Sequence, residues 1–500
     1  MKRALFVCSI FIAILLFASL AIAQQKPVYG GSLTIAQGVE PPGMDPTTAT
    51  SAAIPRVVYT NVLEGLLKVD RDGKIVPALA IDVKTSKDGK EVTFRLKTGV
   101  KFHDGKALDA EDVKFSLERM MDPKTAAPNI AYYRDIESIQ LADSHTVKIN
   151  LKNVNSMLLF NLARPDSVIV HKQAVDKLKT APVGTGPFRF VEWVRGDRIT
   201  LAKFEDYHKK GVPYLDRVTF KFIGDASAQI ASLKAGDIDV IAYDVSPENA
   251  LLLEKDPKFK VLNGYTTTEV ILSTNNSRKP FTDVRVRKAM AYAIDRNALI
   301  KGTMSGYGTP IGSHMDPGNP YYVDLTSTYP YHPEKAKQLL AEAGYPNGFE
   351  AVIKLPDRFA YARRSGEIIA DMLSQVGIRL KIELTEWVQW IDRVFKNGDF
   401  DLTVIGHAEP FDINIYANPK YYFHYDSPRF QETLKKAETE ANPKVQRELY
   451  VTCQKILAED AVNGFLFVLP SLPTMRKEVM NWWRNYPMTA SDVTEVWIQK

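Results

Sequence analysis

The stretch from Phe349 to Ile405 reads FEAVIKLPDRFAYARRSGEIIADMLSQVGIRLKIELTEWVQWIDRVFKNGDFDLTVI and alternates between two hydrophobic periods. Apolar residues recur at every second position in three segments, as in strands, and at helical spacing in the two segments between them. The segments are a strand over 349–355, a helix over 362–376, a strand over 378–384, a helix over 386–396 and a strand over 401–405. This order predicts a β-α-β-α-β unit, and therefore an α/β fold with a parallel sheet and right-handed crossovers.

An aromatic-rich segment, EPFDINIYANPKYYFHYD, follows the last of these strands and covers residues 409–426. Its two prolines favour a loop over a helix. Asp412 lies in it among several large rings, Tyr416 and Tyr421 included, and a carboxylate in such surroundings suits a cationic group on a small ligand. Because open α/β sheets bind ligands beyond the carboxyl ends of their strands, we interpret this segment as a candidate ligand site. The alternative is an ordinary loop that packs its rings on the core.

The chain begins with the pattern of a secretory signal peptide over residues 1–23. Two basic residues precede a long apolar run, and Ala21-Ile22-Ala23 forms a cleavage site of the A-x-A type. The alternative is an uncleaved membrane anchor, which the length of the apolar run permits. Cys8 lies inside the run and does not follow a small residue, so no lipid anchor is predicted. We expect a soluble mature protein that starts near Gln24.

Charge and cysteine content narrow the classes of function. Beyond residue 23, 62 basic and 59 acidic side chains remain, a net charge of +3, which is too balanced to indicate a nucleic-acid partner. Cys453 is the only cysteine after the signal peptide, so no disulfide is predicted within one mature chain. It lies on a helical apolar pattern and is expected in the core.

The mature length is about three times that of a typical domain and predicts two or three lobes. Before residue 180 the sequence indicates antiparallel strands with hairpin turns at Asp72-Gly73 and Asp88-Gly89, and a short helix over 57–64. The composition changes at VGTGPFRFVEW, from Val183, where we place a lobe boundary. Further on, Thr282 is expected to cap one helix that ends at Gly302.

Motifs of catalysis are absent from the sequence: there is no G-x-S-x-G, H-E-x-x-H, P-loop or dinucleotide fingerprint. The eight histidines are scattered and show no paired spacing typical of a metal site. We therefore predict no enzymatic activity, no metal ligands and no cofactor. Carboxylates are numerous, and the sequence alone leaves open a pair of the glycosidase kind.

Several segments together resemble the bacterial extracellular solute-binding proteins of family 5, the dipeptide- and oligopeptide-binding components of ABC importers. The set spans most of the mature chain in the order expected for the family. Its members are YTNVLEGLLKVDRDGKIVPALA from Tyr59, TFRLKTGVKFHDGKALDAEDVKFSLERM from Thr93, VGTGPFRFVEW from Val183, LKAGDIDVI from Leu233, RKPFTDVRVRKAMAYAIDRNALI from Arg278 and PEKAKQLLAEAGYPNG from Pro333.

The resemblance implies a two-lobed periplasmic-binding-protein fold of the class II kind, with a hinge between the lobes and a small α+β lobe inserted near the N-terminus. Lobe I would comprise residues 24–56, 183–275 and 467–500. The inserted lobe II would comprise residues 57–182, and lobe III residues 276–466. Ligand would be enclosed between lobes I and III by hinge closure. The KFHDG segment would belong to the structural core, which argues against a metal role for His103.

The resemblance also implies the roles of individual residues. Asp412 matches an aspartate that pairs with the α-amino group of a peptide, although the run around it lacks the family's proline. Arg358 matches an arginine that holds the ligand carboxylate, and Trp387 a tryptophan near the pocket. Thr50 and Ser51 match a polar loop that contacts the ligand backbone. Surface or core packing is the alternative for these residues.

On this resemblance we expect a monomeric periplasmic receptor that captures a short peptide or amino-acid-derived solute and delivers it to the permease subunits of an ABC importer. The departures from the family pattern around Asp412 leave open other solutes that proteins of this fold bind: oligosaccharides, opines, glutathione and nickel complexes. Trp387, Trp390, Tyr421 and Tyr422 suit the stacking of sugar rings as well as the lining of a peptide side-chain pocket. An envelope enzyme that acts on peptidoglycan fragments is the remote alternative.

Overall fold

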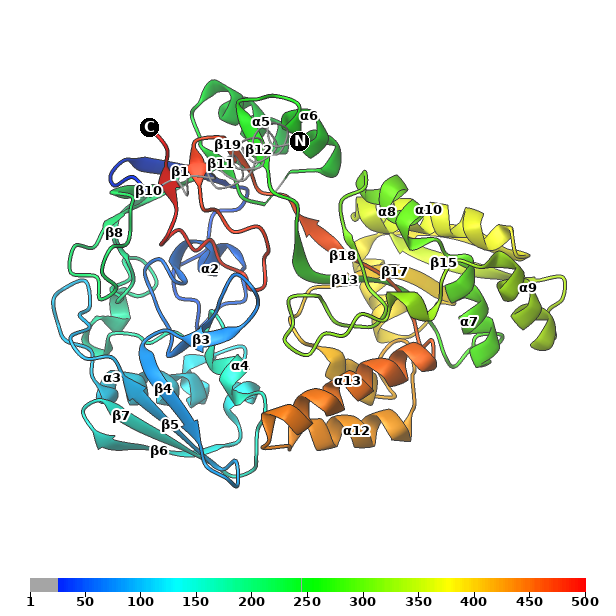
Figure 1. Ribbon diagram of the computed structural model, residues 1–500, viewed down its shortest axis with the longest axis horizontal. Coiled ribbons are helices and arrows are strands. Elements are labelled where there is room, and N and C mark those ends of the chain that lie inside the picture. Colours follow the sequence, from blue (N-terminus) through cyan, green and yellow to red (C-terminus); the bar gives the residue numbers. More distant parts are fainter. Residues whose placement is uncertain (1–25, 244) are drawn as a thin grey trace, which may run out of the picture.

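The computed structural model of the protein describes residues 26–243 and 245–500, so the predicted signal peptide over 1–23 lies outside the described residues. Figure 1 shows two halves: one holds the N-terminal blue and cyan segments, and the other holds the yellow and orange segments. Three larger sheets, of seven, six and four strands, organise these halves. The result confirms a mixed α/β fold.

The six-stranded sheet contains the predicted β-α-β-α-β unit. Its strand order is β14-β18-β13-β17-β15-β16, and β15 pairs in parallel with both β16 and β17, as predicted. The remaining strands are antiparallel, since β17 and β18 both run opposite to β13. The strands are β13 (Gly264–Thr274), β14 (Thr309–Pro310), β15 (Phe349–Pro356), β16 (Ile378–Thr385), β17 (Leu402–His407) and β18 (Gly464–Ser471).

Helices cover this sheet, and two of them differ from the prediction. The helices and turns are α7 (Val284–Ala293), α8 (Arg296–Met304), η4 (Thr326–Thr328), α9 (Pro333–Glu342), α10 (Ala360–Ser374), α11 (Trp387–Trp390), the π-helical η5 (Ile391–Lys396), η6 (Ile413–Ala417), α12 (Pro428–Glu438) and α13 (Pro443–Glu459). The single helix expected from Thr282 to Gly302 is two helices, because Asp295 caps a new one. Gly302 does not end α8 but lies within it, where an added Cβ would come within 2.6 Å of Ile368 on α10.

The seven-stranded sheet draws its strands from three distant parts of the chain. Its order is β12-β19-β11-β1-β10-β9-β8. The strands are β1 (Ser32–Gln37), β8 (Phe188–Val194), β9 (Arg198–Lys203), β10 (Arg217–Phe222), β11 (Val240–Ile241), β12 (Phe259–Val261) and β19 (Thr474–Arg476), accompanied by α5 (Ala226–Ala235), α6 (Pro247–Glu254) and the pair β20 (Val479–Met480) and β21 (Trp497–Ile498). N-terminal, central and C-terminal segments of the chain thus meet in one sheet.

The four-stranded antiparallel sheet has the order β4-β5-β7-β6 and lies entirely within residues 57–182. The elements around it are α2 (Ala53–Val58), β2 (Leu67–Val69), β3 (Ile75–Pro77), β4 (Ala80–Thr85), β5 (Glu91–Leu96), α3 (Ala110–Met121), η1 (Pro123–Thr125), η2 (Ile130–Tyr133), β6 (Ile136–Asp143), β7 (Thr146–Leu151), α4 (Leu158–Leu162) and η3 (Lys172–Lys177). Both predicted hairpins are present, whereas the short helix starts earlier, at Ala53, than the predicted residue 57. One continuous hydrophobic core joins this sheet to the seven-stranded sheet.

A two-stranded ribbon connects the two large sheets. β12 and β19 pair in the seven-stranded sheet, and their continuations β13 and β18 pair in the six-stranded sheet. Between the pairs, the N–H of Leu262 donates to the carbonyl of Pro473 at 3.0 Å. The chain therefore passes between the sheets at residues 262–263 and 472–473, whereas the sequence-based lobe boundaries, at 275 and 467, fall just after β13 and inside β18.

The backbone of the VGTGPF turn packs directly against the backbone of Asn61 and Val62. The N–H of Gly186 donates to the carbonyl of Val62 at 3.0 Å, and that of Phe188 to the carbonyl of Asn61 at 2.9 Å. A Cβ added at Gly184 would lie 1.8 Å from the carbonyl oxygen of Val62. The glycine is therefore required by close approach of two chain segments.

We expect Gly184→Ala to destabilise the protein by about 3 kcal/mol, because the new methyl group meets rigid, buried backbone. Thermal denaturation measures the effect as a lower Tm. Gly224→Ala is the matched control, since its Cβ would meet only the carbonyl of Gly38 at an ordinary 3.6 Å. Equal Tm values for the two variants would contradict the packing described here.

Two further predictions concern the side chains of Cys453 and His103. Cys453 is fully buried in α13, as predicted for a core residue. His103 has both ring nitrogens engaged by backbone: Nδ1 accepts from the N–H of Gly184 at 3.3 Å, and Nε2 lies 2.9 Å from the carbonyl of Gly186. Burial lowers its pKa to about 4, so the ring is neutral. No helix within 26–243 or 245–500 is long and apolar enough to cross a membrane.

Candidate functional site

Three strands of the six-stranded sheet end beside the predicted ligand residues. β15 is followed by Arg358, and β16 by Trp387. β17 ends at His407, five residues before Asp412. Because the three strands are mutually parallel, their carboxyl ends share one edge of the sheet. This is the edge at which open α/β sheets bind ligands.

Arg358 is exposed and makes no ion pair with any residue in the described part of the chain. Its guanidinium lies over two rings, with 5.1 Å from its central carbon to the ring centre of Phe359 and 5.5 Å to that of Trp387. Aromatic faces attract cations and orient the planar guanidinium. The side chain is thus positioned by rings while its hydrogen-bond donors stay free for an anionic group.

Successive ring contacts lead from Arg358 toward Asp412. Trp387 stacks on Trp390 with centroids 5.2 Å apart, and Trp390 meets Tyr422 edge-on at 6.4 Å. Tyr422 in turn stacks on His407 at 6.1 Å. Trp390 and Tyr422 are 2% and 3% exposed, so they support the site from inside and cannot stack on a sugar. Trp387 is partly exposed and is available to a ligand.

Two histidines hold the carboxylate of Asp412. Nε2 of His314 lies 2.7 Å from Oδ1, and Nδ1 of His407 lies 3.3 Å from Oδ2. We define His314, His407 and Asp412 as the His-His-Asp cluster. Its donor atoms all lie within 4.8 Å of one another. The side chain of Asp412 is 14% exposed, so it keeps a route to solvent.

The tautomer of His314 follows from its neighbours. The backbone N–H of Thr274 donates to Oδ1 of Asn463 at 2.9 Å, which orients the amide. Nδ2 of Asn463 then donates to the hydroxyl of Tyr416 at 3.1 Å. That hydroxyl donates to Nδ1 of His314, also at 3.1 Å. The proton of a neutral His314 is therefore on Nε2, from which it is donated to Asp412.

Burial and charge set the protonation of these groups. Burial lowers the pKa of His314 in spite of the nearby Asp412. Burial alone would raise the pKa of Asp412, but the charge and hydrogen bonds of His314, and then of His407, outweigh it and hold the pKa below its usual range. Burial, and then the charges of Asp412 and Asp316, raise the pKa of Glu269 well above its ordinary value. Asp412 is therefore charged at neutral pH, and burial favours the neutral forms of His314 and Glu269.

The sequence contained no signal for the His-His-Asp cluster. His314 lies 98 residues before Asp412, in a buried segment that follows β14, and only the tertiary fold brings the two together. His407 has a weak sequence signal, since it ends a strand just before the aromatic segment. His314 and His407 are therefore close together in the structure although they are far apart in the sequence.

The remaining predicted ligand residues are Tyr416, Tyr421, Thr50 and Ser51, and they differ in burial and in distance from Asp412. Tyr416 is 0% exposed, so we now propose that it positions His314 and does not touch a ligand. Tyr421 is partly exposed and lies 6.3 Å from His407, ring centre to ring centre. Thr50 and Ser51 immediately precede α2 near the seven-stranded sheet. No contact recorded among the described residues joins them to Asp412 or Arg358.

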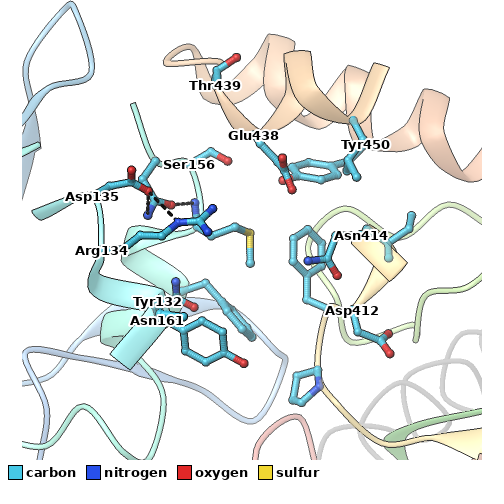
Figure 2. A pocket seen from close by; sticks show the side chains of 18 of the residues that line it. Tyr132, Arg134, Asp135, Ser156, Asn161, Asp412, Asn414, Glu438, Thr439 and Tyr450 are labelled. Carbon is cyan, nitrogen blue, oxygen red and sulfur yellow. Dashed lines mark hydrogen bonds and ion pairs between the residues drawn. The ribbon is translucent and has the colours of Figure 1, made fainter. Parts of the chain in front are cut away.

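A pocket of about 420 Å³ adjoins the aromatic segment. One wall comes from η2, residues 153–157 and α4, and the other from residues 409–414 with the C-terminal part of α12 and Tyr450 of α13. Figure 2 shows the carboxylate of Asp412 turned away from Arg134 and Glu438, which face each other across this space. Asp412 is nonetheless one of the residues that line the pocket, so the pocket adjoins the candidate site.

Comparisons with known proteins agree with this architecture. The family model of bacterial extracellular solute-binding proteins, family 5 (middle region), matches residues 74–427. The glutathione-binding protein GsiB of Pectobacterium atrosepticum is 35% identical over 365 residues, which are 71% of this chain and 70% of that protein.

Solved structures are similar over nearly the whole chain. DppA from Helicobacter pylori, in complex with the peptide STSA, has 27% identity and a TM-score of 0.73, covering 95% of this chain and 99% of that one. AgaA from A. tumefaciens R10, in complex with agropinic acid, has 31% identity and a TM-score of 0.71, covering 94% and 99%. The chain therefore belongs to the bacterial extracellular solute-binding proteins of family 5, which are solute receptors of ABC importers and not enzymes.

Proposed function

We propose that this protein is a periplasmic receptor for a solute that carries a free amine and a carboxylate, either a short peptide or an amino-acid derivative such as glutathione. The observation that carries the proposal is the arrangement at one sheet edge. Arg358, a cation with no ion pair among the described residues, and the charged carboxylate of Asp412 lie at the two ends of a series of aromatic contacts. Such an arrangement suits a solute with opposite charges at its two ends.

Similar proteins support this class of solute. GsiB is named a glutathione-binding protein, DppA was solved with a peptide and AgaA with agropinic acid. Trp387 and Tyr421 offer partly exposed rings for the apolar part of the solute. The 420 Å³ pocket beside residues 409–414 offers room for a larger solute to extend.

We further propose that the two lobes close on the solute about the ribbon at residues 262–263 and 472–473. Only two short connections cross there, and a few residues are enough to absorb the backbone rotation of a hinge. Thr50 and Ser51 would approach the solute from lobe I on closure. A monomer released from its signal peptide would then deliver the solute to the permease subunits.

Calorimetric titration of the mature protein tests the proposal. We expect binding of at least one of glutathione, a dipeptide and a tetrapeptide, and no binding of a neutral disaccharide. The titrations contain a metal chelator, so that the result reports on the solute alone. Binding of the disaccharide, with none of the three charged solutes bound, would contradict the proposed function.

A further inference from the structure

The His-His-Asp cluster brings together three side chains from separate parts of lobe III. His314 follows β14, His407 ends β17, and Asp412 precedes η6. Their three nearest ligand atoms lie within 4.8 Å of one another. We propose that this cluster binds one divalent transition-metal ion of the zinc kind. The inference goes beyond the proposed function and does not rest on it, although the ion and the amine of the solute would compete for the carboxylate of Asp412.

The two nitrogen–oxygen separations are close to those around such an ion, although they involve different oxygens of Asp412, and the ligand nitrogens of the two histidines lie within 4.8 Å of each other. Two ligands at about 2.0–2.1 Å from zinc, in tetrahedral geometry, are roughly 3.3 Å apart. Nδ1 of His407 is already 3.3 Å from Oδ2 of Asp412. Nε2 of His314, at 2.7 Å from Oδ1, would move outward by about half an ångström as its proton is released. Two imidazoles and a carboxylate are a donor set that zinc accepts.

In His314 and His407, the ring nitrogen that faces away from the cluster contacts a tyrosine hydroxyl. Nδ1 of His314 contacts the hydroxyl of Tyr416, which Asn463 holds in turn. Nε2 of His407 lies 3.1 Å from the hydroxyl of Tyr422. Partners at the second nitrogen orient metal-binding histidines and are a regular part of such sites. Both rings are therefore held in place before any ion arrives.

The buried side chain of Glu269 is an independent observation in favour of a cation at the cluster. Its Cα is the register partner of His407 on the neighbouring strand β13, so the two side chains stand on one face of the sheet. It is 2% exposed, yet its Oε2 has no hydrogen-bond partner among the described residues. Buried polar atoms are rarely left in this state. A cation in the neighbouring cluster, with its bound water, would give this oxygen a partner.

Three protein donors leave a tetrahedral ion with one open position. The partly exposed Asp412 lies on the solvent side of the cluster, while His314 is fully buried behind it. The open position would therefore be filled by water from the side of Asp412. Figure 2 shows this carboxylate turned away from Arg134, so that guanidinium does not compete for it.

Calorimetry with zinc chloride alone tests the site. The full mature protein is first stripped with a chelator and dialysed, and no solute is added. We expect one ion per chain, and a weakening by more than about 100-fold in His407→Gln, since even outer partners of metal ligands account for 10–100-fold. Tyr416→Phe should weaken zinc binding by about tenfold. Cobalt(II) should show visible absorption bands with the wild type that His407→Gln loses.

His145→Gln is the matched control, because this ring lies at the β6–β7 turn of the four-stranded sheet, remote from the cluster. It should bind zinc like the wild type. Thermal denaturation verifies that each variant is folded, and Asp412→Asn replaces His407→Gln if the latter is not. Wild-type affinity for zinc no higher than that of His407→Gln would overturn the inference. That result would leave the proposed function untouched, since the solute titrations contain no metal.

Discussion

Asp412→Asn should weaken the binding of a solute with a free amine by two to three orders of magnitude. The variant removes the negative charge that His314 and His407 contact, and a desolvated ammonium would then lack this counter-ion. Breaking a buried charge pair on one side costs on the order of 3–5 kcal/mol. Calorimetry in the presence of a chelator measures the change in Kd.

The N-acetylated form of the same solute separates this effect from a general disturbance of the site. Acetylation removes the ammonium, so wild type and Asp412→Asn should bind the acetylated solute with similar, low affinity. Asp371→Asn on the exposed surface of α10 is the control for the loss of one carboxylate and should bind like the wild type. Equal affinity of Asp412→Asn and wild type for the free amine would remove the proposed role of Asp412.

Arg358→Gln should weaken the binding of the same solute by about 10- to 100-fold. This corresponds to the roughly 1.5–3 kcal/mol of a hydrogen bond to a charged group. Its guanidinium is exposed and free of ion pairs among the described residues, so the stability of the fold should not change. Arg358→Lys should recover little of the loss, because an ammonium lacks the planar fork that binds both oxygens of a carboxylate.

A solute whose carboxylate is converted to an amide tests the assignment of Arg358. The effect of Arg358→Gln should vanish with the amide and persist with the acid. Arg379→Gln, at the other end of β16 from Trp387, is the control for the loss of one positive charge. If the amide solute is as sensitive to Arg358→Gln as the acid, the arginine does not bind the carboxylate.

Local sequence patterns predicted those parts of the site that lie next to regular elements. Alternation at Ala351, Ile353 and Leu355 was enough to identify β15. Asp412 became a candidate because it follows the last strand of the parallel unit, and position after a strand is a short-range property of the sequence. Arg358, in contrast, was assigned from the resemblance to the family.

Features that depend on distant contacts were not predicted. His314 joins Asp412 only through the path of a buried segment, and no local pattern marks it. Tyr416 lies in the same aromatic segment as Tyr421, yet the structure buries it completely and its hydroxyl accepts from Asn463. Likewise, one apolar pattern spans α7 and α8, but Asp295 divides it by capping a second helix.

The most direct test of the central claim is mass spectrometry of whatever the purified mature protein releases on denaturation. Because the lobes would enclose the solute, a molecule acquired in the cell should survive purification. We predict a compound with both a free amine and a carboxylate, such as a short peptide or glutathione. A sugar, or any compound without a cationic group, would contradict the pairing of Asp412 and Arg358 with the two ends of the solute.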